Sequence, residues 1–195
     1  MKVKICGITG MEDAAMSEEE GADALGFVHF SGRRRSLPLS EIKEIIDSIG
    51  PMTVKVLVCD PKSAKEASEF ARLSGADVLQ VYSLQPQDLQ EFRDSGGKVI
   101  RAVKPSKVEA ERFAGCADAL LFEMGEPGTG TPYDYSTVPT DCCRKAIIAG
   151  GLRIDNLDPA KAKRPYALDV SSGVEIVPGR KDRGLVAEFI RRCKE

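Results

Sequence analysis

The stretch Lys4-Ile5-Cys6-Gly7-Ile8-Thr9 places a single thiol at the point where a strand ends and a helix begins. Residues 3–6 have the apolar and β-branched character of a short strand, and Gly7 suits a sharp turn. Thr9 followed by Glu12 predicts a capping box that opens a helix. Open α/β sheets and closed β/α barrels place their ligands at the carboxyl ends of parallel strands. Cys6 is therefore the first candidate for chemistry.

Apolar runs of this kind recur along the whole chain and alternate with helical patterns. The eight expected strands are residues 3–6, 24–28, 54–58, 78–81, 99–103, 119–122, 146–149 and 167–170. This βαβ rhythm implies a parallel sheet with right-handed crossovers, and eight units close a (β/α)₈ TIM barrel. The 195 residues form one domain, 1–195. Because such barrels typically have about 250 residues, some outer helices should be short or missing, above all those after the fifth and sixth strands.

A weak internal repeat sets the register of this barrel. Gly-Ala-Asp-Ala-Leu at 21–25, Gly-Ala-Asp-Val-Leu at 75–79 and Cys-Ala-Asp-Ala-Leu at 116–120 each mark a helix end that leads into a strand. Counting the same number of residues from each start reaches Val28, Tyr82 and Glu123. The repeat therefore predicts that Glu123 lies at the carboxyl end of the sixth strand, on the face that Cys6 occupies.

Composition and charge exclude several classes of partner. The chain is 42% hydrophobic and 30% charged, with a formal net charge of −2, which gives no reason to expect nucleic acid or an anionic membrane as partner. A strand follows Met1-Lys2 at once, and no apolar run approaches the ~20 residues of a membrane span. We expect a cytoplasmic protein that is a monomer or a homodimer.

The cysteines and the single histidine argue against a metal site. The six cysteines show no CxxC spacing, and His29 alone cannot complete a His-rich site, so neither zinc nor structural disulfides are expected. Apart from Cys6, the cysteines are interpreted as small hydrophobic residues in or near the core. They are Cys59, Cys116, Cys142, Cys143 and Cys193.

An acid and two small-residue turns complete the candidate site. Glu123 ends an apolar strand, where partial burial would raise its pKa toward a range useful for proton transfer; the alternative is a solvated strand-end carboxylate. Gly150-Gly151 and Ser171-Ser172-Gly173 follow the last two strands, and in such barrels these loops often bind phosphate. The alternative is a pair of ordinary tight turns.

Three further features have weaker signals. Lys4 lies on the same side of its strand as Cys6, and the eighth strand carries Asp169 beside it, so we hypothesise a Lys4–Asp169 pair inside the barrel rather than a lysine that snorkels to the rim. One arginine of Arg33-Arg34-Arg35 could hold a substrate carboxylate. The loop at 128–130 lacks the spacing of a nucleotide-binding motif.

Together these motifs resemble the phosphoribosylanthranilate isomerase family of tryptophan biosynthesis over nearly the whole chain. The matching segments are 4–9, 21–28, 79–80, 128–130 with 133–135, 149–152 and 169–175. The first and last are quite specific to the family. The resemblance implies an aldose–ketose isomerase, a small (β/α)₈ barrel that carries out an Amadori rearrangement without cofactor or metal.

The resemblance also implies a role for each candidate residue. Cys6 matches the general base that removes the C2′ proton, and Glu123 matches the general acid that opens the ribose ring. Arg35 matches the arginine that holds the anthranilate carboxylate, and Asp169 an aspartate near the substrate nitrogen. The phosphate is expected at Gly150, Gly151, Ser172 and Gly173, and Gln80 is a further substrate-binding residue.

The sequence departs from the family pattern at three places. Glu123 stands where the family usually has aspartate, Tyr82-Ser83 where it usually has His-Gly, and arginines with Gly32 precede Arg35 where a Lys-Ser-containing run is usual. Two alternatives follow. One is another sugar-phosphate isomerase or epimerase, and the other is a non-catalytic barrel that binds phosphorylated ligands.

Overall fold

The computed structural model describes residues 1–125 and 130–195. Gly128 and Thr129 of the glycine-rich loop lie outside the described residues. Within them, no helix has both the length and the apolar character to cross a membrane. In the same ranges, no group of three His, Cys, Asp or Glu residues is placed to hold a metal ion.

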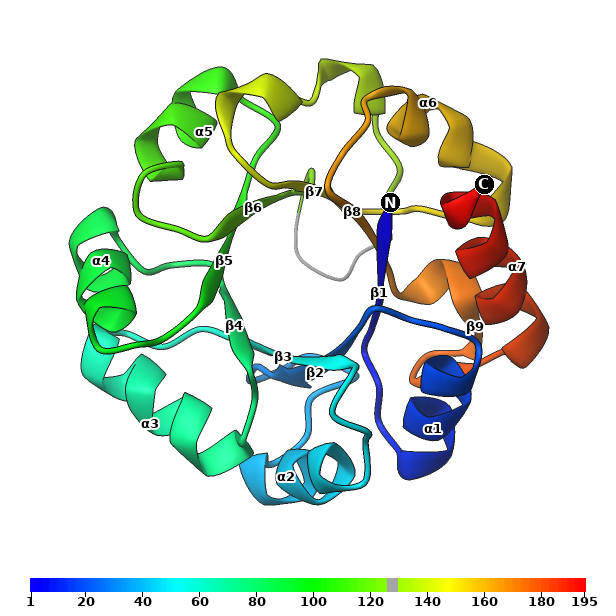
Figure 1. Ribbon diagram of the computed structural model, residues 1–195, viewed down its shortest axis with the longest axis horizontal. Coiled ribbons are helices and arrows are strands. Elements are labelled where there is room, and N and C mark those ends of the chain that lie inside the picture. The colour runs from blue at the N-terminus through cyan, green and yellow to red at the C-terminus, as the bar shows by residue number, and fades with distance from the viewer. Residues whose placement is uncertain (126–129) are drawn as a thin grey trace.

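Eight parallel strands close into a barrel in sequence order, as predicted, and Figure 1 shows them as a central ring with the helices outside. The strands are β1 Lys2–Cys6, β2 Ala24–His29, β3 Val54–Cys59, β4 Val78–Val81, β5 Val99–Val103, β6 Ala119–Phe122, β7 Ala146–Ile148 and β8 Ala167–Val170. Pairing of β1 with β8 completes the ring and sets Lys4 opposite Asp169.

The outer layer is uneven in length. Its helices are α1 Met11–Glu19, α2 Leu39–Asp47, α3 Ala64–Ser74, α4 Pro86–Asp94, α5 Lys107–Phe113, α6 Leu157–Ala162 and α7 Arg183–Lys194. After β6, only the 3-10 turns η1 Tyr135–Thr137 and η2 Thr140–Cys142 precede β7 in the described residues. The expectation of brief or missing helices after the fifth and sixth strands is thus confirmed, and α6 is also short.

Two apolar layers follow from the alternation of side chains along the strands. Residues of one parity, such as Ile5, Leu25 and Phe27, pack against the helices. Residues of the other parity fill the barrel, where Val56, Ile100 and Leu121 belong to a separate cluster. The same inward parity directs polar residues of β1, β4 and β8, and Glu123 just after β6, into the pocket described below.

The repeat has a structural role at the amino ends of the strands. Asp23 Oδ2 accepts a hydrogen bond of 2.9 Å from Val3 N, and Asp77 Oδ2 accepts one of 2.8 Å from Lys55 N. Asp118 Oδ2 accepts a bond of 2.8 Å from the N–H of the first residue of β5. Each aspartate therefore satisfies a backbone donor of the preceding strand, which explains the shared Asp of the three segments.

The capping box expected at the first helix is wrong. Gly10 is the N-cap of α1, and it makes no side-chain cap. Thr9 Oγ1 instead donates to Gly179 O at 2.5 Å. Gly179 joins two short strands, β9 Glu175–Val177 and β10 Arg180–Lys181. A contact with this distant hairpin has displaced the local cap, which sequence spacing alone does not reveal.

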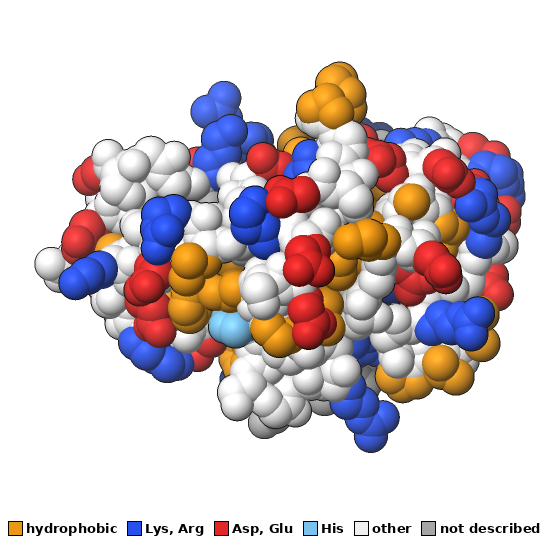
Figure 2. Space-filling view, turned by 90° about the horizontal axis from the view of Figure 1, so that it is seen from below, with side chains coloured by type: hydrophobic (Ala, Val, Ile, Leu, Met, Phe, Trp, Pro, Cys, Tyr) orange, Lys and Arg blue, Asp and Glu red, His pale blue; other side chains and the backbone are white. Residues whose placement is uncertain are grey.

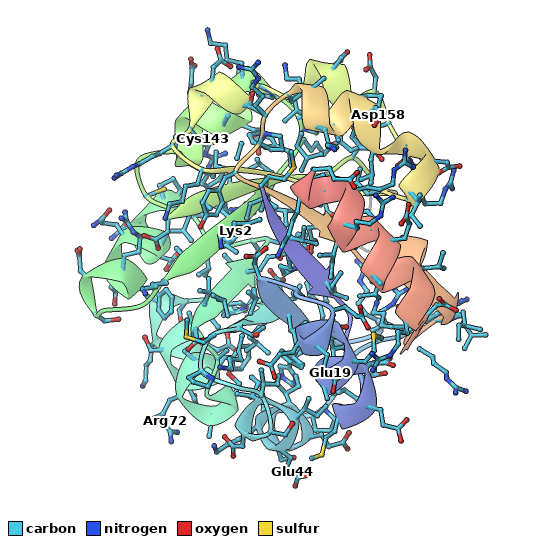
Figure 3. The ribbon with its side chains drawn as sticks, turned by 45° about the vertical axis from the view of Figure 1, so that its right-hand side comes forward. Lys2, Glu19, Glu44, Arg72, Cys143 and Asp158 are labelled. Carbon is cyan, nitrogen blue, oxygen red and sulfur yellow. The ribbon has the colours of Figure 1, made fainter. Side chains whose placement is uncertain are left out.

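The two ends of the chain lie close together. Figure 1 shows α7 beside α1, and Figure 3 shows Glu19, near the end of α1, beside the red helix α7. Arg183 at the start of α7 donates to Glu19 and Glu20 at 2.7 and 2.6 Å.

The side of the molecule seen in Figure 2 carries interspersed acidic and basic side chains. That mixture agrees with the small net charge of −2.

Candidate active site

One pocket of about 300 Å³ opens at the carboxyl ends of the strands. Its lining contains eight of the nine residues predicted for the site, namely Cys6, Arg35, Gln80, Glu123, Gly150, Gly151, Asp169 and Ser172. Gly173 is the exception: a Cβ on it would lie 2.0 Å from Leu152 O, so it packs against the loop after β7. The barrel thus brings together residues from nearly the whole length of the chain.

Cys6 lies at the end of β1 beside a buried ion pair. Lys4 Nζ and Asp169 Oδ1 are 2.8 Å apart, and both side chains are buried, which confirms the predicted pair. A Cβ at Gly26 would lie 2.8 Å from Cys6 Sγ and 3.0 Å from Lys4 Cε. Glycine in the neighbouring strand therefore makes the room that both side chains occupy.

The charges around Cys6 act in opposite directions on its thiol. Burial raises the pKa of Cys6 above its ordinary value and the Asp169 charge adds to the rise, while the Lys4 ammonium, and more weakly Lys181, oppose it without reversing it. Burial alone would lower the pKa of Lys4, but Asp169 and Cys6 raise it above its ordinary value, so Lys4 stays protonated. A fixed positive charge therefore stands beside the sulfur and limits the rise in the pKa of Cys6.

Glu123 enters the pocket from the end of β6. Burial raises the pKa of its carboxyl, and interaction with Tyr82 opposes the rise. Its buried Oε1 accepts no hydrogen bond from the described residues. A Cβ at Gly150 would lie 3.3 Å from Glu123 Cβ, so the glycine after β7 leaves room for the Glu123 side chain. A carboxyl with a raised pKa and one oxygen free of hydrogen bonds from the described residues is suited to proton donation.

Arg35 reaches the pocket across the turn after β1. A Cβ at Gly7, whose φ is +78°, would lie 2.4 Å from Arg35 Cδ. Arg35 Nε and Nη2 donate to the two oxygens of Glu175 at 2.8 and 2.6 Å. No hydrogen bond joins its Nη1 to another described residue, which leaves one edge of the guanidinium for a ligand. All three arginines of the run line the pocket, and of these Arg34 is exposed whereas Arg33 and Arg35 are half-buried.

Sequence reasoning missed a buried lysine that holds this end of the barrel together. Lys181 Nζ donates to Cys6 O at 2.6 Å, to Glu175 Oε1 at 2.8 Å and to Ser171 O at 3.3 Å. It thereby ties the ends of β1 and β8 to the hairpin of β9 and β10. Lys181 follows Gly179-Arg180 in a polar segment, and no periodic pattern distinguishes it from a surface lysine.

The glycine pair after β7 is fixed by two residues whose roles were also missed. Tyr135 Oη donates to Gly150 O at 2.8 Å, and Asn156 Nδ2 donates to Gly151 O at 2.9 Å. Gly150 and Gly151 have φ of +86° and +68°. With both carbonyls engaged, the two N–H groups donate to no described acceptor and are available for an anion.

The remaining cysteines lie away from the pocket. Cys59, Cys116 and Cys193 are buried, and Cys142 and Cys143 are half-buried and pack against the core, as predicted. None of these five cysteines lines the pocket. All six cysteines are described, and each is a free thiol.

Comparison with known proteins assigns the chain to a family. The family model for N-(5'phosphoribosyl)anthranilate (PRA) isomerase matches residues 3–192. The N-(5'-phosphoribosyl)anthranilate isomerase of Pseudomonas putida (strain GB-1) is 36% identical over 202 residues, covering 100% of this chain and 98% of that protein.

Solved structures give the same result. Phosphoribosyl anthranilate isomerase from Thermus thermophilus superimposes with a TM-score of 0.89 at 33% identity, covering 100% of this chain and 98% of that one. A phosphoribosyl anthranilate isomerase in complex with reduced 1-(o-carboxyphenylamino)-1-deoxyribulose 5-phosphate has a TM-score of 0.89 at 29% identity, with the same coverage. The chain belongs to the N-(5′-phosphoribosyl)anthranilate isomerase family.

Proposed function

We propose that this protein converts N-(5′-phosphoribosyl)anthranilate to 1-(2-carboxyphenylamino)-1-deoxyribulose 5-phosphate by general acid–base catalysis. The observation that carries the proposal is the position of Cys6 and Glu123. They end β1 and β6, which are three strands apart in the ring, and both line the same pocket. A thiol and a carboxyl can therefore approach a sugar from different sides, as this reaction requires.

The reaction needs one proton donated and one removed. Glu123 donates its proton to the ribose ring oxygen as the C1′–O bond breaks, and the anthranilate nitrogen supplies the electron pair that forms the C1′=N⁺ bond. Cys6, as thiolate, takes the proton from C2′, and those bonding electrons neutralise the iminium to give an enolamine. Tautomerisation of the enolamine gives the ketone product. Each step leaves charge and atoms balanced.

The groups around the two catalytic residues bind and orient the substrate. The free edge of Arg35 holds the anthranilate carboxylate, and Asp169, aligned by Lys4, accepts from the substrate nitrogen. The phosphate binds the N–H groups of Gly150 and Gly151 and the first turn of η4 Ser172–Val174, which carries Ser172 and Gly173. Gln80, buried beneath the pocket, is a further contact.

The test is turnover of substrate made in situ from anthranilate and ribose 5-phosphate, with the parent protein, Cys6→Ser and Glu123→Gln. We expect the parent to consume the substrate and each variant to lose activity by about two to four orders of magnitude. An inactive parent that still binds a substrate analogue would establish the alternative of a non-catalytic binding protein. Turnover of another sugar phosphate alone would establish the alternative of a different isomerase or epimerase.

Oligomeric state and location remain predictions. We infer a monomer or a homodimer, which sedimentation equilibrium of the purified protein distinguishes by mass. Cytoplasmic location is the expectation for an enzyme acting on a phosphorylated metabolite, and fractionation of the source cells tests it.

A further inference from the structure

Two of the departures from the family pattern meet in the pocket. Tyr82 follows β4 and Glu123 follows β6, both in the inward-facing register, and both line the pocket above the intervening β5. The internal repeat had already placed them at one level of the barrel. The tyrosine and the longer acid are therefore neighbours, although the sequence separates them widely.

The oxygen of the Tyr82 hydroxyl already accepts a hydrogen bond. Gln80 Nε2 donates to Tyr82 Oη at 3.1 Å, and Gln80 is buried. A phenol has a single proton, so a hydroxyl that accepts from an amide is left with that proton to donate elsewhere. Glu123 lines the same pocket, and its carboxylate is the charge that acts most strongly on this hydroxyl.

The tyrosine ring is held in place and its hydroxyl stays protonated. The ring of Phe30 meets the Tyr82 ring edge-on, with centroids 5.8 Å apart and an interplanar angle of 82°. Burial, with the Glu123 charge second, raises the pKa of Tyr82 well above its ordinary value. At any working pH the hydroxyl therefore acts toward Glu123 as a donor.

We propose that Tyr82 is a positioning residue for the general acid: held by the Gln80 amide, its hydroxyl donates to one oxygen of Glu123 and leaves the acidic proton on the other. Oε1 is buried and accepts no hydrogen bond from the described residues, so it is the oxygen left in need of a donor, and the acidic proton is then carried by Oε2. The extra methylene of glutamate carries the carboxyl toward the hydroxyl. The two departures from the family pattern, Glu123 and Tyr82, therefore depend on each other. The part of this inference that concerns proton donation to the substrate rests on the proposed function.

The first test measures the carboxyl itself, without turnover. Tyr82→Phe removes only the hydroxyl, and ¹³C NMR of protein labelled at the glutamate carboxyls follows the titration of Glu123, assigned by its absence in Glu123→Gln. We expect Tyr82→Phe to raise the pKa of Glu123, because a hydrogen bond to the charged form is lost. An unchanged titration would overturn the proposal, whether or not the protein is an isomerase.

Tyr133→Phe is the matched control. Tyr133 Oη donates to the Phe122 carbonyl at 3.0 Å, at the same strand end, and not to a carboxyl. Removing this hydroxyl should leave the Glu123 titration where it is in the parent. A shift as large as that of Tyr82→Phe would show that any hydroxyl lost nearby perturbs the acid, and the specific role of Tyr82 would be rejected.

The second test is a double-mutant cycle on turnover. We expect Tyr82→Phe to lower kcat about tenfold with KM nearly unchanged, since the acid and not substrate binding is affected. In the Glu123→Asp background the carboxyl is drawn back by one methylene, and the same change should alter kcat less than twofold. Equal losses in both backgrounds would contradict the linkage, and the NMR titration decides the matter if a variant lacks measurable turnover.

Discussion

Three aspartates at the amino ends of the strands and Glu123 at the carboxyl ends have opposite surroundings. At the amino ends of the strands, Asp23, Asp77 and Asp118 each accept a backbone N–H bond from a neighbouring strand. At the carboxyl ends, the buried Oε1 of Glu123 accepts no hydrogen bond from the described residues. The three aspartates therefore stabilise the fold, whereas Glu123 keeps one buried oxygen without a partner among the described residues.

The pKa values of Asp23 and Glu123 are shifted in opposite directions. The pKa of Asp23 is lowered, because hydrogen bonds from Lys2 and from Val3 N outweigh its partial burial, whereas burial raises the pKa of Glu123. A satisfied carboxylate stabilises the folded state, and a desolvated one costs stability but becomes a proton donor near neutral pH. The contrast teaches that pairing, rather than residue type, separates structural from catalytic acids here.

The largest predicted effect is that Glu123→Gln lowers activity while it raises the stability of the fold. Its kcat should fall by about two to four orders of magnitude, while its stability at pH 8 should exceed that of the parent. The folded-state pKa lies above the unfolded value near 4.5, so the buried carboxylate destabilises the protein only above that range. Urea unfolding at pH 8 and pH 4 should show the gain at pH 8 alone; a loss at pH 8 would contradict it.

The second prediction concerns the charge beside the thiol. Lys4→Met removes the ammonium that lowers the pKa of Cys6, so alkylation of Cys6 by iodoacetamide at pH 7.5 should slow about tenfold for each unit by which that pKa rises. Peptide mapping separates Cys6 from the other cysteines. Lys4→Arg keeps the charge and should retain most of the rate; if it slows as much as Lys4→Met, packing and not charge is responsible.

At the amino ends of the strands, Asp118→Ala should lower the stability of the fold without affecting catalysis. It removes the acceptor of the N–H that begins β5, and the loss of such a bond costs about 1–3 kcal/mol. Equilibrium urea unfolding measures the loss, and steady-state assays should give a kcat within twofold of the parent. A tenfold fall in kcat would show that the two ends are coupled.

The smallest predicted effect is the acid dependence of Asp23. Since its folded-state pKa lies below 3.8, its carboxylate contributes stability above that value, and the contribution is lost as the pH falls through the folded-state pKa. Asp23→Asn should therefore be less stable than the parent at pH 6, with the difference vanishing at strongly acidic pH. A difference that persists in acid would assign the effect to packing.

Much of this organisation could be predicted from the sequence because it depends on local periodicity. Strand parity placed Lys4, Cys6 and Asp169 inside the barrel, and the repeat placed Glu123 at the level of Tyr82. Contacts between distant segments could not be predicted in this way. The bond of Thr9 to Gly179 displaced the expected helix cap, and Lys181 beneath Cys6 looks like any surface lysine in the sequence.

The roles of Tyr135 and Asn156 show the same limit. Both residues bind carbonyls of the glycine pair, from segments on either side of it. Sequence analysis predicted the turn because glycine pairs have a local signature. It did not predict what fixes the turn, because a tyrosine and an asparagine in loops have many possible partners.

The central claim is that Cys6 and Glu123 act together as base and acid on one substrate, and single-turnover kinetics test it most directly. With enzyme in excess over phosphoribosylanthranilate, the parent, Cys6→Ser and Glu123→Gln are compared with the double variant by the decay of substrate fluorescence. We predict that each single variant is slower than the parent by at least about a hundredfold. The double variant should be far faster than the product of the two losses, because the residues act as a unit. Either single variant within threefold of the parent would contradict the account.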